Sequence, residues 1–258
     1  MLRYSYLFSQ LVRRELRQKY KGSVLGVLWY FINPLVIMAL YGVMLGPLLH
    51  AVSIPDYPIF ILAGLLVWLF FSQSLLAASG SLVEQSSLVS RVRFPREAVP
   101  AAVVAVQLVP FFAMLLMLLP VSLIIRGNAS PALLELVPLV VLLFLFTLGL
   151  SLLVAVLHAY YRDVQPVLNA ALMPLFFISG VLFQIEKLPG LHSHHWAEPL
   201  LRWGNPIAPF ISSVRTVVFY CRTPDTPTLL YVAVAAVLSA AFGIALFRRM
   251  EGELAVVL

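Results

Sequence analysis

The sequence predicts an all-α integral membrane protein, and three observations lead to this class. Of the 258 residues, 62% are hydrophobic and only 11% are charged, and the mean hydropathy is +0.98. Soluble domains are about half apolar and about one quarter charged, so this chain has too few charged residues to cover a soluble globule. Six apolar stretches are also long enough to cross a bilayer, which takes about 20 residues each. Together these properties exclude a soluble enzyme, a disordered chain and a coiled coil.

The predicted spans are separated by short stretches rich in proline, glycine and polar residues. The six spans are residues 25–49, 59–80, 98–125, 132–157, 166–184 and 228–247. The first is longer than the ~7–15 apolar residues of a signal peptide and no small-residue cleavage site follows it, so we expect it to stay in the membrane. An even number of spans places both termini on the same side.

Lysine and arginine residues are distributed unevenly between the two predicted sides. Twelve of the 17 fall on the side of the termini, and six of these precede the first span: Arg3, Arg13, Arg14, Arg17, Lys19 and Lys21. Basic residues accumulate on cytoplasmic segments, so we predict that both termini are cytoplasmic. The net charge of +6 then belongs to one membrane face, and no nucleic-acid partner is predicted.

Residues 1–22 are expected to form an amphipathic helix that lies in the membrane interface. Its apolar side consists of Leu7, Phe8, Leu11, Val12 and Leu16, and its basic side of Arg13, Arg14, Arg17 and Lys21. The basic side suits anionic headgroups, and docking of a cytoplasmic partner on the same side is a second interpretation.

Two further segments outside the spans have mixed composition. The cytoplasmic segment 80–98 contains a short helical stretch, and apolar residues such as Phe94 stand among its charges. This pattern indicates a surface buried against a partner or against the chain's own helices. The outer segment 185–227 is too polar to span the membrane and carries Trp196 and Trp203. Such a mixture is typical of interfacial or re-entrant helices.

The chemical groups needed for ion-driven transport or for catalysis are scarce in the predicted spans. No Asp, Glu, Lys or Arg lies in the middle of a span, whereas ion-coupled transporters need such groups at depth. The sequence contains no P-loop, so we do not expect this chain to bind ATP. The histidines at 192, 194 and 195 match no standard metal signature, and the single cysteine, Cys221, cannot form an internal disulfide.

Uncharged polar and aromatic side chains occupy the spans instead. Tyr30, Asn33 and Tyr41 share one face of the first span. Phe71 in the second span and Phe177 in the fifth complete our candidates for a neutral, aromatic passage. Such a wall would suit a carbohydrate polymer, whose C–H faces stack on aromatic rings. Ordinary packing and lipid contact are the alternative explanation.

A distinctive run near the N-terminus extends from Arg13 to Gly26 (Arg-Arg-Glu-Leu-Arg-Gln-Lys-Tyr-Lys-Gly-Ser-Val-Leu-Gly) and continues through Trp29 to Asn33-Pro34-Leu35. This run resembles the N-terminus of the ABC-2 type permeases that export polysaccharides. Further similar motifs follow in the family's order: Phe94-Pro95-Arg96-Glu97, Tyr161-Arg162-Asp163, Phe176-Phe177-Ile178-Ser179-Gly180, Leu188-Pro189 and Asn205-Pro206-Ile207-Ala208-Pro209. The likeness covers nearly the whole chain, so residues 1–258 are expected to form a single ABC-2 transmembrane domain.

The resemblance implies a permease without bond chemistry of its own, in the bacterial cytoplasmic (inner) membrane. It would work as a homodimer, and each subunit would pair with a separate ATPase subunit that binds ATP and Mg²⁺, so this chain needs no cofactor. A lipid-linked polysaccharide of the O-antigen, capsule or teichoic acid type would pass through the dimer interface. Segment 80–98 would serve as the coupling helix and 185–227 would line the exit. The expected ATPase contacts are Arg13, Arg14, Arg17, Tyr20, Arg91, Phe94, Arg96 and Glu97.

Two alternatives stay open. The first is an ABC-2 permease for a drug or a small lipid, which the Arg13–Gly26 run and the extended outer segment disfavour. The second is a membrane enzyme acting on lipid-linked sugars, with His158, Arg162 and Asp163 at the inner face.

Overall fold

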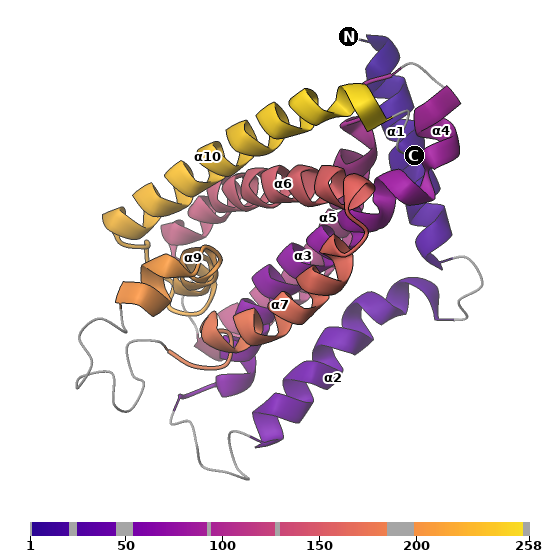
Figure 1. Ribbon diagram of the computed structural model, residues 1–258. Helices are drawn as coiled ribbons and strands as arrows, with labels where there is room; N and C mark the ends of the chain where they lie inside the picture. Colours follow the sequence, from indigo (N-terminus) through magenta and orange to yellow (C-terminus); the bar gives the residue numbers. More distant parts are fainter. Residues whose placement is uncertain are drawn as a thin grey trace.

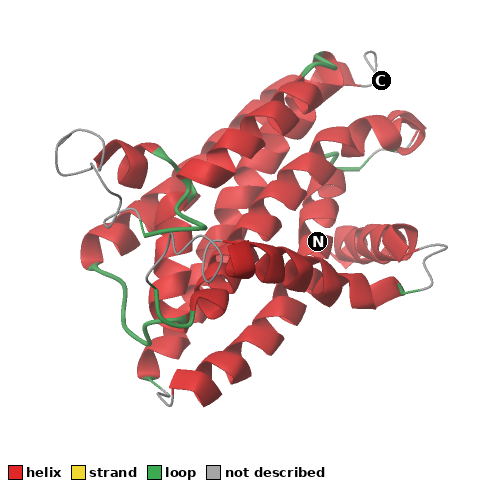
Figure 2. Cartoon of the chain, turned by 90° about the horizontal axis from the view of Figure 1, so that it is seen from below, coloured by secondary structure: helices red, strands yellow, loops and turns green. Residues whose placement is uncertain are grey.

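The computed structural model describes residues 2–20, 25–44, 54–91, 94–126, 130–184 and 199–254. Every regular element in these ranges is helical, which confirms the predicted all-α class (Figures 1 and 2). The helices are α1 (Leu2–Tyr20), α2 (Trp29–Val43), α3 (Tyr57–Glu84), α4 (Ser86–Arg91), α5 (Ala98–Arg126), α6 (Leu136–Tyr160), α7 (Val164–Ile178), α9 (Ala208–Val218) and α10 (Thr226–Met250). Short helical turns occur at Gly26–Leu28, Pro131–Glu135, Leu200–Gly204 and Glu251–Glu253.

Four helices in the described ranges are long and apolar enough to cross a membrane. They are Tyr57–Glu84, Ala98–Ile125, Pro131–Tyr160 and Thr226–Met250, and they coincide with four of the six predicted spans. The other two predicted spans, 25–49 and 166–184, contain α2 and α7, which have 15 residues each. At 1.5 Å per residue such a helix is about 22 Å long, shorter than the ~30 Å hydrocarbon core. Residues 45–49 lie outside the described ranges.

The end of α7 has a local cause in the sequence. Gly180 adopts a positive φ of 70°, the left-handed conformation that glycine provides two residues after many helices. The remaining residues of the predicted fifth span, up to Gln184, form turns rather than helix.

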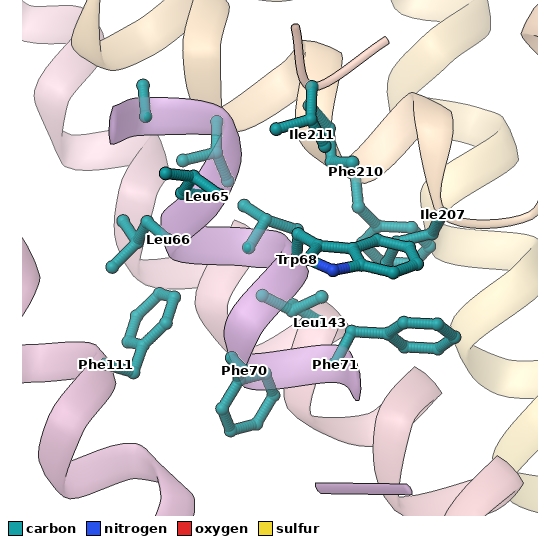
Figure 3. Packing of buried hydrophobic residues seen from close by; sticks show 14 of the residues in the cluster. Leu65, Leu66, Trp68, Phe70, Phe71, Phe111, Leu143, Ile207, Phe210 and Ile211 are labelled. Atoms are coloured by element: carbon teal, nitrogen blue, oxygen red, sulfur yellow. The ribbon is translucent and has the colours of Figure 1, made fainter. Parts of the chain in front are cut away.

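Helix α3 is the centre of the bundle. It contacts α5, α6, α9, α2 and α7. Most of its residues are buried, so the helix is enclosed around its circumference. A helix that is apolar all round needs such complete enclosure. Figure 3 shows the packing of Leu65, Leu66, Trp68, Phe70 and Phe71 of α3 with Phe111 of α5, Leu143 of α6, and Ile207, Phe210 and Ile211 at α9.

The bundle has two distinct ends. At the first, called here the α1 end, a second apolar cluster joins Leu82 of α3, Val99 of α5, Leu152 of α6 and Phe247 of α10. The opposite end is called the α9 end. There the Tyr57 hydroxyl donates a hydrogen bond to the Leu182 carbonyl at 2.7 Å.

Helices α6 and α10 run side by side with their backbones in contact (Figure 1). A Cβ atom on Gly149 would lie 2.2 Å from the Ser239 carbonyl oxygen, and one on Gly243 would lie 2.1 Å from the Gly149 carbonyl oxygen. Only glycine fits at either position. The close approach also lets the Ser239 hydroxyl donate to the Phe146 carbonyl at 2.8 Å. Small residues allow this kind of contact between apolar helices.

Candidate functional site

Helix α1 lies against the outside of α5 at the α1 end. Its apolar side faces the bundle, and Leu11 is only 4% exposed. Arg13, Arg14 and Arg17 lie on the opposite side and are exposed. The apolar side of this helix therefore packs on protein, and its basic side stays accessible.

A polar contact joins α1 to the junction of α3 and α4. The Gln85 amide donates a hydrogen bond to the Glu15 carboxylate. Burial raises the pKa of Glu15 above its ordinary value, the nearby Glu84 acts in the same direction, and Arg14 opposes both. The protonated form of Glu15 is therefore better accommodated at this contact than it is in water.

The turn before α5 is tied to the end of α10. The Arg96 guanidinium donates to the Glu251 carbonyl, and Arg248 pairs with Glu97 at 3.3 Å. Phe94 packs against the second apolar cluster. These three expected contact residues, 94, 96 and 97, thus lie at the same end as the basic side of α1. The side chains of Tyr20 and Arg91 lie outside what the structure describes.

The passage candidates whose side chains the structure describes differ in their surroundings and in their exposure. Asn33 is exposed and lines an open cavity of about 330 Å³. Tyr41 packs on Phe176, with 6.1 Å between ring centroids, and Phe177 is 45% exposed on α7. Phe71 is only 2% exposed.

Phe71 belongs to the packed core instead (Figure 3). Its ring stacks on Phe146 with a centroid distance of 5.9 Å, and this burial argues against a place on a passage wall. The side chain of Tyr30 lies outside what the structure describes.

The structure brings a lysine of α1 into contact with α5, which the sequence does not suggest. The Lys19 ammonium donates to Gln107 Oε1 at 2.6 Å, and burial lowers the pKa of Lys19. Gln107 is nine residues after the first residue of α5, roughly 14 Å along the helix. A count of charges within each span misses this contact, because the cation comes from the neighbouring helix.

The α9 end contains a buried arginine within the predicted outer segment. Arg215 is 6% exposed and donates to the carbonyls of Gly180 at 2.8 Å and Val181 at 2.9 Å. Its guanidinium carbon lies 3.7 Å from the centroid of the Phe60 ring. The signal available in the sequence is a single charged residue among the apolar and hydroxyl side chains of α9.

Sequence comparison identifies the family to which this bundle belongs. A family model described as "ABC-2 type transporter" matches residues 6–219. The chain belongs to the ABC-2 type transporter family. An ABC-2 chain is the membrane-spanning permease of a transporter that also contains an ATP-binding subunit, so the protein is a multi-pass membrane protein.

Several curated relatives of this ABC-2 permease align over nearly the full length. The O-antigen export system permease protein RfbA of Myxococcus xanthus is 32% identical over 92% of this chain and 89% of its own length. The protein of the same name from Klebsiella pneumoniae is 24% identical, over 98% and 96%. The polysialic acid transport protein KpsM of Escherichia coli is 26% identical, over 93% and 92%.

The residues of the enzyme alternative occupy unlike environments in the ABC-2 permease. His158 is 6% exposed in α6, whereas Arg162 and Asp163 are exposed in the turn that follows. Among the described residues, no three His, Cys, Asp or Glu side chains form a group suited to a metal ion. The histidines at 192, 194 and 195 lie outside those residues.

Proposed function

We propose that this permease moves a lipid-linked polysaccharide of the O-antigen, capsule or teichoic acid type across the bacterial cytoplasmic membrane. The observation that carries the proposal is the full-length similarity to permeases named for O-antigen export and for polysialic acid transport. The two named cargoes are both carbohydrate polymers, which fits the neutral, aromatic side chains expected along a passage.

The proposed topology is a single transmembrane domain over residues 1–258, with six spans and both termini in the cytoplasm. The contacts at the α1 end support it, because α1, segment 80–98 and residues 248–254 meet there. These are the segments to which the basic residues assign a cytoplasmic location. In this arrangement α2 and α7 contribute the first and fifth spans, and residues 185–227 line the outer exit.

The proposed assembly is a homodimer that encloses the passage between two copies of the α2 and α7 faces. Asn33 on α2 and Asn169 on α7 are exposed on these faces, where contact with lipid is costly for an amide. A second subunit and a hydrated polymer would remove that cost. Asn33, Tyr41 and Phe177 are then the passage residues, with Tyr30 expected beside them.

The proposed ATPase contact is the basic side of α1 together with α4 and residues 94–97. Arg13, Arg14 and Arg17 present positive charge there, and α4 would serve as the coupling helix within segment 80–98. The ATPase subunit supplies the ATP and Mg²⁺ sites, and this chain contributes none. If the ATP-bound partner binds one of two permease conformations more tightly than the other, that difference in affinity is sufficient to drive the transport cycle.

A complementation experiment tests the proposed cargo. The chain's own gene is deleted, and surface glycan is measured by immunoblot with and without a tagged copy of the chain. Loss of surface glycan with intracellular accumulation of lipid-linked polymer is expected, together with a P-loop ATPase that co-purifies with the tagged chain. Unchanged glycan with reduced drug efflux would establish the drug alternative. Glycan-modifying activity of the purified chain without any ATPase would establish the enzyme alternative.

A cross-linking experiment tests the proposed dimer face. In a Cys221→Ser background, Asn169→Cys is expected to give a dimer-sized band on treatment with a short bifunctional reagent in native membranes. Leu230→Cys, an exposed position on α10, is the matched control and should stay monomeric. The reverse result would move the interface from α7 to α10.

A further inference from the structure

A second cavity, of about 160 Å³, opens at the α9 end of the bundle. It lies between the first turn of α3, the turns that follow α7, and one face of α9. Ser179 and Gly180 of its wall come directly after α7, the helix that carries the passage candidate Phe177. A polymer that leaves the proposed passage along α7 would therefore meet this cavity next.

One wall of the cavity is a row of hydroxyl groups. Ser212 and Thr216 line it from α9, where they are about one helical turn apart and share a face. Tyr220, in the turn after α9, extends the row and is 37% exposed. The Thr216 hydroxyl donates to the Ser212 carbonyl at 2.8 Å, so its oxygen can still accept a hydrogen bond.

Gln184 adds an amide to the same cavity. Its Nε2 atom donates to the Tyr220 hydroxyl oxygen, and the phenol proton is then available to a further acceptor. Its Oε1 atom is buried, and no donor among the described residues bonds to it. A buried acceptor without a donor is unfavourable, and a hydroxyl group of a ligand would satisfy it.

Arg215 gives this wall a fixed shape. Its guanidinium donates to the carbonyls of Gly180 at 2.8 Å and Val181 at 2.9 Å, and it covers one face of the Phe60 ring at 3.7 Å. These contacts join the three segments around the cavity before any ligand arrives. A site that is held in place in this way loses little entropy on binding.

We propose that this cavity binds one sugar unit of the exported polymer at the outer exit, an inference that rests on the proposed function. Sugar hydroxyls both donate and accept hydrogen bonds, as the row on α9 and the Gln184 amide require. The apolar face of the sugar ring would lie on Tyr220, whose own ring is held edge-on by Phe219 at 4.8 Å.

The size of the cavity sets how much of the polymer it holds. At about 160 Å³ it is smaller than the ~300–1,000 Å³ of sites that enclose drug-sized ligands, so it takes a single unit rather than a longer stretch. A few hydrogen bonds to neutral groups are also weak enough to release each unit as the polymer advances.

The test uses the full chain, with the subunits that co-purify with it, in nanodiscs. The probe is an oligosaccharide released by mild acid from the surface glycan of the source strain, and its binding is measured by saturation-transfer difference NMR. Ser212→Ala should raise the Kd of the oligosaccharide about fivefold, the effect of one lost hydrogen bond. Ser213→Ala is the matched control, because its buried hydroxyl donates to the Pro209 carbonyl at 2.8 Å and does not line the cavity. It should leave the Kd unchanged.

A labelling experiment tests occupancy of the cavity independently. In a Cys221→Ser background, the oligosaccharide should prevent most of the labelling of Ser212→Cys by a membrane-impermeant maleimide. Thr223→Cys, an exposed position in the loop before α10, should label equally with and without it.

Two results would overturn the subsite. They are an equal Kd for Ser212→Ala and Ser213→Ala, and labelling of Ser212→Cys that the oligosaccharide does not slow. If deletion of the gene still removes the surface glycan, either result rejects the subsite alone. Failure of the proposed function would instead appear as unchanged surface glycan in the deletion strain.

Discussion

The guanidinium of Arg215 lies face-on to the ring of Phe60, 3.7 Å from its centroid. The same group donates to two carbonyls that follow α7, so one side chain connects α3, α7 and α9. The connection depends on Gly64, because a Cβ atom there would lie 2.4 Å from Arg215 Nη2. The aromatic face and the carbonyl dipoles stabilise a positive charge in a mostly apolar setting.

Arg215→Met should destabilise the α9 end. The substitution leaves the buried carbonyls of Gly180 and Val181 without these donors, and each such loss costs about 1–3 kcal/mol. We expect the Tm of the purified protein to fall by at least about 4 °C. Gly64→Ala should also lower the Tm, by displacing the guanidinium. In the Arg215→Met background Gly64→Ala should cost less than half as much, and additive effects would show that the two residues are not coupled.

Gly149→Ala should separate α6 from α10. The added methyl group meets backbone atoms that cannot move aside, and overpacking of this kind costs about 1–3 kcal/mol. A lower Tm and loss of the protein from membranes, measured by immunoblot, are expected. Gly252→Ala is the control, because a Cβ atom there meets nothing within 4 Å. Equal behaviour of the two variants would contradict the close packing.

Glu15→Gln should stabilise the docking of α1 near neutral pH. Burial raises the pKa of Glu15 in the folded protein above its ordinary value of 4.5. Glu15 therefore makes its full contribution to the free energy of unfolding at pH values below 4.5. The contribution is lost as the pH rises through the folded-state pKa. Glutamine keeps an oxygen that accepts from Gln85 and carries no charge. The Tm difference between variant and wild type should therefore grow from about pH 4 to pH 7, and a constant difference would refute the assignment.

Arg96→Glu should uncouple ATP hydrolysis from export. The substitution removes the hydrogen bond to the Glu251 carbonyl and places a carboxylate next to Glu97, so the turn before α5 is released from α10. We expect the reconstituted complex to continue to hydrolyse ATP, whereas cells that carry the variant should lose surface glycan and insert the chain normally. Arg249→Glu serves as the charge-matched control. Export and stimulated hydrolysis that both survive Arg96→Glu would remove this turn from the coupling path.

Composition and apolar length were sufficient to predict the fold class and four of the long helices. The apolar stretch at 166–184 is longer than the helix that it contains, because hydropathy does not show where a helix ends. In α7 the stop depends on the conformation of Gly180, which is a matter of backbone geometry rather than polarity. Residues 94–97 and the basic side of α1 were placed at one end from their charges alone.

The contacts between side chains of different helices could not be predicted from the sequence. Lys19 and Gln107 are 88 residues apart, and neither stands out in its own helix. Arg215 lies in segment 185–227, whose mixed composition indicates a position outside the spans, and its contacts with Phe60 and with two carbonyls inside the bundle could not be predicted from that composition. Phe71 was selected for its aromatic ring, and nothing in its neighbourhood distinguishes a core position from an exposed one.

The backbone contact between Gly149 and Gly243 makes α6 and α10 a stiff pair. At this contact the two backbones touch directly. No layer of side chains lies between them there that could be compressed when one helix moves. One end of α10 is held to the turn before α5 through Arg248 and Glu97. At the opposite end, Asp225 pairs with Arg202 at 3.1 Å and Tyr231 donates to the Trp203 carbonyl at 2.8 Å. We therefore expect α6 and α10 to move together as one unit, so that a displacement at one end of the pair also displaces the other end.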